Sequence, residues 1–209
     1  DCDVVHEVMQ GSPTLFLTGG RKDPSTLCRT LVQAGLGDLP VTVGENLTRP
    51  EQAIRTGTAR AFSGETFSPL SVLLVEPAPL SPRRSPGWPD SDFIRADGVP
   101  MTKQEVRAAI LSKLAVEPDD LCWDIGAGTG SVSVELAALC REVWAVEHDR
   151  DALALLQQNR ERFHAYNLRM LEGTAPQVLS GLPAPDAVFV GGSSGQLSDI
   201  LQSVHSSNP

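Results

Sequence analysis

The sequence predicts an α/β fold, in which a doubly wound parallel sheet follows a small α/β unit. Three observations carry this prediction. From residue 121 onward, short apolar runs typical of buried strands alternate with apolar residues at helical spacing. A glycine-rich turn at residues 124–130, D-I-G-A-G-T-G, separates the first of these strands from its helix. Acidic residues and glycines follow several strands, at the edge where ligands bind in such sheets.

Residues 1–77 predict the small α/β unit. We expect strands over residues 14–18, 41–43 and 71–75, a helix from Asp23 that ends at Gly35, and a second helix after Pro50. Asp23 is a suitable helix cap, and the proline that follows it suits the first helical turn. Leu27 and Leu31 belong to the apolar face of this helix.

A proline cluster follows this unit, between residues 77 and 89. Proline-rich segments adopt extended conformations and connect domains. We therefore divide the chain into a first domain, residues 1–77, a linker, residues 78–90, and a second domain, residues 91–209.

The second domain begins with a predicted helix whose start is marked by Thr102 and Glu105. Their T-x-x-E spacing is that of a capping box, in which the two side chains bond to backbone N–H groups at the helix start. The alternative is that the Thr102 side chain lies over a bound ligand. Beyond this helix we expect strands over residues 121–123, 143–146, 167–171 and 186–190, with helices over residues 132–139 and 149–163.

The glycine-rich turn is the strongest candidate binding site. Glycines let the backbone approach a ligand closely, and the helix N-terminus behind them presents unpaired N–H groups. Glu147 follows the second strand, where a carboxylate can accept both hydroxyls of a ribose. The spacing is G-x-G-x-G, whereas dinucleotide-binding folds have G-x-G-x-x-G. We therefore predict a nucleoside site, with an ordinary tight turn or a nicotinamide dehydrogenase as alternatives.

Charge and cysteine usage exclude several classes of protein. The net charge is −9 and aromatic residues make up 5% of the chain, so neither nucleic acid nor an anionic membrane is an expected partner. No apolar run approaches the roughly 20 residues of a membrane span. The four cysteines form no C-x-x-C pair and lie near no histidine at metal-ligand spacing. We expect no metal and a reducing, cytoplasmic setting.

Residues 124–130 and Glu147 resemble the D-x-G-x-G-x-G loop and the ribose-binding acid of class I S-adenosylmethionine-dependent methyltransferases. Three further motifs occur with them in order: P-M-T-K-Q-E-V-R at residues 100–107, G-T-A-P at residues 173–176 and V-G-G-S at residues 190–193. As a set, over residues 88–205, they resemble the decarboxylating precorrin-6Y C(5,15)-methyltransferase family of cobalamin biosynthesis. Residues 1–77 resemble the C-terminal half of the tetrapyrrole methylase domain that precedes this module in the fused enzymes.

The resemblance implies that S-adenosylmethionine is the cofactor and that the substrate is a precorrin, an anionic tetrapyrrole. It implies decarboxylation with methylation of carbon 15 by the second domain, methylation of carbon 5 by the first, and a homo-oligomer, often a tetramer. Cofactor contacts then fall on Thr102, Gly126, Ala127, Gly128, Thr129, Gly130, Glu147 and Ala175. Class I sheets have seven strands, so we expect a truncated sheet here, and only part of a methylase domain in front of it.

No catalytic acid or nucleophile is identified, because the cofactor supplies the difficult chemistry. A substrate with many carboxylates requires positive charge near the site. The hypothesised basic patch consists of Arg83, Arg84, Arg95, Lys103 and Arg107. Two other functions stay open: a class I methyltransferase acting on protein or RNA, and an inactive fragment or assembly partner. Residues 191–195, G-G-S-S-G, replace the N/D-P-P-Y run of many amino-group methylases, which argues against the first.

Overall fold

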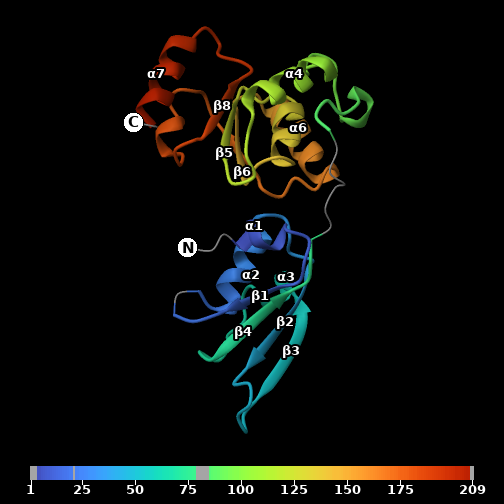
Figure 1. Ribbon diagram of the computed structural model, residues 1–209, viewed down its shortest axis with the longest axis vertical. Helices are drawn as coiled ribbons and strands as arrows, with labels where there is room; N and C mark the ends of the chain where they lie inside the picture. Colours follow the sequence, from blue (N-terminus) through green and yellow to red (C-terminus); the bar gives the residue numbers. More distant parts are fainter. Residues whose placement is uncertain (1–3, 21, 79–84, 208–209) are drawn as a thin grey trace. The chain divides into compact units, whose positions relative to one another are not determined.

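The computed structural model describes residues 4–20, 22–78 and 85–207, and the chain divides into two compact units, Asp1–Leu80 and Ser81–Pro209 (Figure 1). The boundary between the units falls inside the predicted linker, residues 78–90. Arg83 and Arg84 of the hypothesised basic patch lie outside the described residues. No helix in the described part of the chain is long and apolar enough to cross a membrane.

The first unit is a four-stranded antiparallel sheet with three helices. Its elements are α1 (Val4–Val8), β1 (Thr14–Leu17), α2 (Pro24–Gln33), β2 (Pro40–Glu45), β3 (Ala53–Thr58), α3 (Ala59–Phe62) and β4 (Ser71–Val75), with the strand order β1-β4-β2-β3. As predicted, Asp23 caps α2, because its carboxylate accepts the N–H of Thr26 at 2.7 Å. Leu31 of α2 and Leu73 of β4 are fully buried in the core of this unit.

The helix predicted after Pro50 is the short α3, but it is preceded by β3, a strand that we did not predict. This strand pairs antiparallel with β2, from Pro40 opposite Thr58 to Glu45 opposite Ala53. Alternating Ile54 and Thr56 suit a strand, since β-branched side chains pack well on a pleated surface. The Arg49-Pro50 signal is local, whereas the pairing with β2 depends on a partner that only the tertiary fold supplies.

The second unit is built on a parallel sheet. Its elements are η1 (Asp90–Asp92), α4 (Gln104–Leu114), β5 (Leu121–Ile125), α5 (Ser131–Ala137), β6 (Glu142–Glu147), α6 (Arg150–Arg162), β7 (Leu168–Glu172), η2 (Leu179–Gly181), β8 (Ala187–Val190) and α7 (Leu197–Ser207). The strand order is β7-β6-β5-β8, and each neighbouring pair is parallel. The chain reverses its direction of winding between β5 and β8, so the predicted doubly wound parallel sheet is confirmed.

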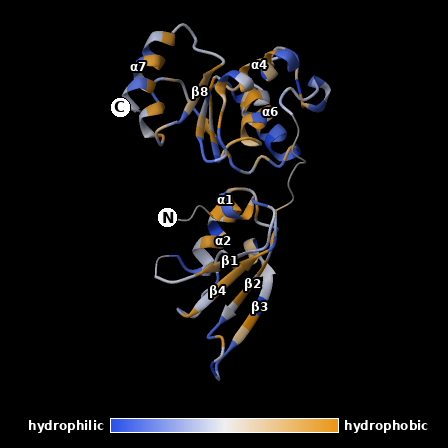
Figure 2. Ribbon diagram, in the orientation of Figure 1, coloured by the Kyte–Doolittle hydropathy of each residue, from blue (hydrophilic) through white to orange (hydrophobic). Residues whose placement is uncertain are grey.

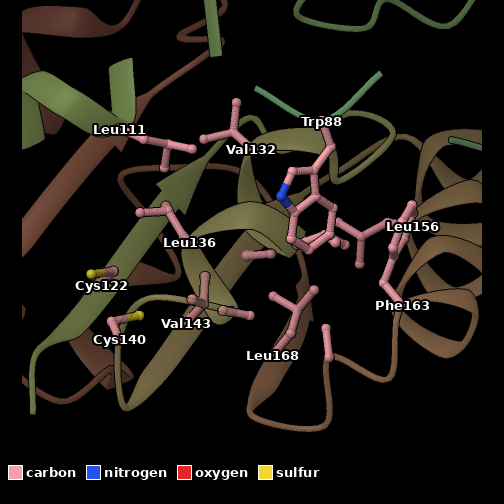
Figure 3. Packing of buried hydrophobic residues seen from close by; sticks show 14 of the residues in the cluster. Trp88, Leu111, Cys122, Val132, Leu136, Cys140, Val143, Leu156, Phe163 and Leu168 are labelled. Atoms are coloured by element: carbon pink, nitrogen blue, oxygen red, sulfur yellow. The ribbon is translucent and has the colours of Figure 1, made fainter. Parts of the chain in front are cut away.

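Helices cover both faces of this sheet. On one face, α4, α5 and α6 pack over a cluster that includes Leu136, Val143 and Leu156 (Figure 3). On the other, α7 and η2 supply Ile200 and Leu179 to a second cluster. Figure 2 shows the central strands as mostly hydrophobic, as expected for a sheet that is buried on both sides.

The predicted capping box at Thr102 is wrong. Helix α4 begins one residue later, with Lys103 as its N-cap and no side-chain bond to the cap. The Thr102 carbonyl instead accepts a hydrogen bond from the guanidinium of Arg107. A buried side chain on the helix therefore fixes the position of Thr102, which the local T-x-x-E pattern does not reveal.

Candidate functional site

A cavity of about 290 Å³ lies at the carboxyl ends of the parallel strands. Its walls come from five segments, with Ile200 of α7 added: residues 98–102, the glycine turn with the start of α5, the end of β6 with the start of α6, the loop after β7, and the end of β8 with its loop. This is the edge of the sheet where the winding reverses, and where ligands bind in doubly wound folds. The lining consists of many small residues and several apolar ones, together with the polar side chains of Asp124, Glu147, His148 and Asp149.

The glycine turn packs against a second pair of glycines, Gly191 and Gly192, which follow β8. Gly126 has a φ of +74°, and a Cβ at this position would lie 2.5 Å from the backbone nitrogen of Gly192. Gly128 has a φ of +56°, and a Cβ there would lie 3.2 Å from the carbonyl oxygen of Pro100. Both positions therefore require glycine, for conformation as well as for space.

Glu147 connects the glycine turn to the end of β6. Its carboxylate is buried, and Oε2 accepts the N–H of Gly128 at 2.9 Å. Oε1 accepts the N–H groups of His148 at 2.8 Å and Asp149 at 2.9 Å. A carboxylate has about four acceptor positions, so Oε2 keeps the capacity to accept a hydrogen bond from a ligand hydroxyl.

Asp124 lies in the cavity wall and is only 1% exposed. Its Oδ2 accepts the hydroxyl of Ser133, while Oδ1 has no partner among the residues that the structure describes. Burial raises the pKa of Asp124 to about 6, and the negative charge of Glu147 adds to the rise, whereas the Ser133 hydroxyl opposes it. A buried oxygen without a partner is uncommon and needs an explanation, and Asp124 lines the cavity.

The structure brings most of the predicted cofactor residues together. Six of the eight line the cavity: Thr102, Gly126, Ala127, Gly128, Glu147 and Ala175. Thr129 and Gly130 are buried and are not among the described residues that line it. The Thr129 carbonyl accepts a bond from Asn159, and Gly130, with a φ of +76°, begins α5 against Leu156.

The prediction that Arg107 belongs to the basic patch is wrong. This side chain is fully buried and forms ion pairs with Glu135 at 2.7 Å and Asp90 at 2.8 Å, so it cannot contact a substrate. Arg95 and Lys103 are exposed, with the Lys103 ammonium 3.7 Å from Asp90. Only these two members of the patch are both described and accessible.

Several residues of the site were missed in the sequence. Gly98 and Val99 line the cavity, yet no local pattern distinguishes them from ordinary loop residues, whereas Pro100 and Ser193 belong to the family motifs but were given no role. Asn159 is different, because it falls on the apolar side of α6 with Leu155 and Leu156, and all three are buried. An amide among core positions is a signal that could have been used, since buried amides need specific partners.

Comparison with known proteins identifies the family. Residues 92–208 match the family model of the precorrin methyltransferase domain. The chain belongs to the precorrin methyltransferase domain family. Methyltransferases of this class use S-adenosylmethionine, so membership implies that cofactor. The resemblance stated from the motifs is confirmed.

Two relatives of the chain are named as decarboxylating precorrin methyltransferases. The chain is 46% identical over 125 residues to a probable cobalt-precorrin-6B C(15)-methyltransferase (decarboxylating) of Pyrobaculum calidifontis, covering 58% of this chain and 64% of the relative. It is 35% identical over 192 residues to a precorrin-6Y C(5,15)-methyltransferase [decarboxylating] of a Sinorhizobium species, covering 87% of this chain and 45% of the relative. The chain thus spans less than two thirds of either relative.

A solved structure agrees on the fold. The crystal structure of precorrin-6y C5,15-methyltransferase from Geobacter metallireducens matches with a TM-score of 0.55 and 41% identity, over 58% of this chain and 64% of that one. The predicted class I methyltransferase fold is therefore confirmed for the precorrin methyltransferase domain of this chain.

Proposed function

We propose that the chain binds S-adenosylmethionine in the cavity of its second unit and methylates a precorrin at carbon, with decarboxylation, in cobalamin biosynthesis. One observation carries the proposal: the glycine turn and Glu147 line the same cavity and are joined by the bond from the Gly128 N–H to Oε2. A nucleoside with a charged amino-acid end needs both features at one place. Had they been on different sides of the sheet, no such site could form.

The residues present fit this cofactor. Gly126 and Gly128 line the cavity without side chains, and they let the turn pack closely against Gly192 and Pro100, which lie 2.5 and 3.2 Å from where a Cβ would be. Glu147 has acceptor capacity for ribose hydroxyls, and the unpartnered Oδ1 of Asp124 can accept from a cationic donor. In the proposal, Ala175 lies beside the base, and Thr102 closes the opposite wall.

When bound, the cofactor supplies an electrophilic methyl group, and the chain's own residues position the two reactants. The backbone of the turn and Glu147 hold the donor at the strand ends. The loop after β8 contributes Gly192 and Ser193 to the cavity wall. No residue is assigned as a catalytic acid.

The substrate class follows from the family and from charge. The relatives are named for precorrins, which are polyanionic, and the chain has a net charge of −9, so local positive groups must offset repulsion. Arg95 and Lys103 are exposed next to the cavity-lining residues 98–102 and are proposed as these groups. A protein or RNA substrate has less support, since the names of the close relatives specify precorrins.

Calorimetric titration with S-adenosylmethionine tests the cofactor. We expect binding by the wild-type chain, weakened about 10- to 100-fold in Glu147→Ala, because bonds to a charged acceptor are lost. Glu172→Ala is the matched control: Glu172 lies opposite Glu147 on the neighbouring strand, is exposed and pairs with Arg150. Equal affinity in both variants would contradict the assignment of Glu147.

Incubation with a precorrin-6 substrate and S-adenosylmethionine tests the reaction. The proposal expects methyl transfer to the tetrapyrrole together with release of carbon dioxide. Cofactor binding without either product would favour the alternative, an inactive fragment or assembly partner.

Further proposals concern the first unit, the oligomeric state and partners, and the location. We propose that the first unit is part of a tetrapyrrole methylase domain for carbon 5, which the alignment over 87% of this chain supports. We also propose that the protein is a homo-oligomer, a tetramer, and light scattering would measure its mass. We further propose that it binds neither nucleic acid nor membranes. A cytoplasmic location is proposed on the three described cysteines, Cys28, Cys122 and Cys140, which are buried free thiols.

A further inference from the structure

Residues 87–102, here called the strap, cross the second unit before α4 begins. The strap supplies Gly98, Val99, Pro100 and Thr102 to the cavity wall. Its only regular element is the three-residue helix η1, and few of its backbone groups bond to one another. The position of this wall therefore depends on contacts made by the strap with the rest of the unit.

A buried ion pair holds the two ends of the strap. At one end, the N–H groups of Gly87 and Trp88 donate to the Glu135 carboxylate at 2.6 and 3.0 Å. Arg107 donates to the same carboxylate at 2.7 Å and to the carbonyls of Trp88 and Thr102. Both Arg107 and Glu135 are at most 2% exposed. One guanidinium thus fixes the start of the strap and Thr102 at its end.

Aromatic packing supports this pair. The Trp88 ring lies 5.1 Å from Phe163 and 6.4 Å from Phe93, and the Arg107 guanidinium stands 4.6 Å from the Phe93 ring centroid. Figure 3 shows the Trp88 indole between Val132 and the pair Leu156 and Phe163. The first half of the strap is therefore part of the hydrophobic core.

A buried amide holds the middle of the strap to the glycine turn. The side-chain nitrogen of Asn159 donates to the carbonyls of Ile94 at 3.0 Å and Thr129 at 2.9 Å. Its oxygen accepts the N–H of Ile94 at 2.7 Å. Asn159 is fully buried on α6 and is absent from the cavity wall, so it connects two cavity segments without touching the cavity itself.

We propose that Arg107, Glu135 and Asn159 are positioning residues: they hold the strap over the glycine turn so that Thr102 and Pro100 complete the cavity for the methyl donor. This inference rests on the proposed function for the identity of the ligand. The chemistry suits the task, because a buried polar group must have partners with defined geometry, whereas apolar packing tolerates slippage. The strap therefore has one register against the turn.

The test compares two buried asparagines. Asn159→Asp keeps size and shape but places an acceptor against the carbonyls of Ile94 and Thr129. Asn167→Asp makes the same change where the amide donates to the carbonyls of Ala137, Cys140 and Arg141, away from the cavity. Both variants lose hydrogen bonds from an amide to backbone carbonyls. If Asn159 had a purely structural role, the two substitutions would therefore affect ligand binding equally.

The first readout is the affinity of the full chain for S-adenosylhomocysteine, measured by calorimetry well below the melting temperature of each variant. We expect Asn159→Asp to bind about tenfold more weakly, since small displacements of positioning groups have large effects. Asn167→Asp should bind like the wild-type chain. Equal affinities in the two variants overturn the proposal.

The second readout needs no ligand. Hydrogen exchange of peptides covering residues 94–103 should be faster in Asn159→Asp and unchanged in Asn167→Asp. If the wild-type chain does not bind the probe, the proposed function fails, while exchange still decides whether Asn159 orders the strap. Should Asn159→Asp not fold, Glu135→Gln, which removes the charge facing Arg107, must loosen the same peptides; unchanged exchange there overturns the proposal.

Discussion

Gly126 illustrates how one residue depends on both its backbone and its neighbours. Its φ is +74°, and a Cβ would meet Gly192 at 2.5 Å. Gly195 has a similar φ of +83°, but nothing lies within 4 Å of the position of a Cβ. Alanine substitutions at these two positions therefore distinguish the cost of conformational strain from the cost of steric overlap.

We expect Gly126→Ala to lower the free energy of unfolding by about 3 kcal/mol, because left-handed strain and overpacking add. Gly195→Ala should lower it by about 1 kcal/mol, from strain alone. Urea denaturation of both variants measures the difference. Equal losses would show that the loop after β8 moves aside without cost.

Asp124 makes the stability of the second unit depend on pH. Its pKa is raised to about 6 in the folded chain, mainly by burial, from its ordinary value of 3.8. Between these values the folded state binds a proton that the unfolded state does not, so stability from this group is present at low pH and is lost as the pH rises through 6.

We therefore expect the free energy of unfolding of the wild-type chain, relative to Asp124→Asn, to fall by up to about 3 kcal/mol between pH 4 and pH 7. The variant keeps a hydrogen-bonding group near Ser133 and lacks the titration. Urea denaturation of both chains across this range checks the slope. Parallel curves would mean that Asp124 titrates near its ordinary value.

At the scale of elements, two helix starts look alike in sequence and differ in structure. Asp23 accepts the N–H of Thr26 and caps α2, whereas Thr102 makes no cap bond to α4. Local capping patterns depend on where the helix begins; α4 begins at Gln104, and the Thr102 carbonyl accepts a bond from Arg107 of the same helix.

Asp23→Ala should therefore cost about 1 kcal/mol of the stability of the first unit, the usual value for a lost cap. Thr102→Ala should change the stability of the second unit by less than about 0.5 kcal/mol, as a substitution without a buried bond. It should weaken binding of S-adenosylmethionine, because Thr102 lines the proposed site. Thermal denaturation with calorimetric titration separates the two effects, and a large stability loss in Thr102→Ala would restore the capping interpretation.

At the scale of the whole molecule, every described residue that lines the cavity belongs to the second unit. We expect residues 85–209, produced alone, to fold and to bind S-adenosylmethionine with the affinity of the full chain, within about threefold, since no contact in the proposed site is lost. Calorimetry on both proteins checks this. Loss of binding in the shorter protein would show that the first unit completes the site.

From the sequence alone one can predict the parallel sheet, the glycine turn and the place of Glu147 at the strand ends. These features depend on local periodicity and on residue types that few other structures require, as at Gly126 and Gly128. Family motifs added Thr102 and Ala175, which also line the cavity.

The other features of the fold and the site depend on contacts between segments that the sequence does not reveal. Residues 53–58 are a strand because β2 lies beside them, and Arg107 is a buried anchor because Glu135, Asp90 and the strap surround it. Asn159 bridges Ile94 and Thr129, which are separated from it by 65 and 30 residues in the chain. The physical reason is the same in each case: the preference of a side chain is set by partners distant in sequence, and only folding brings them within hydrogen-bonding distance.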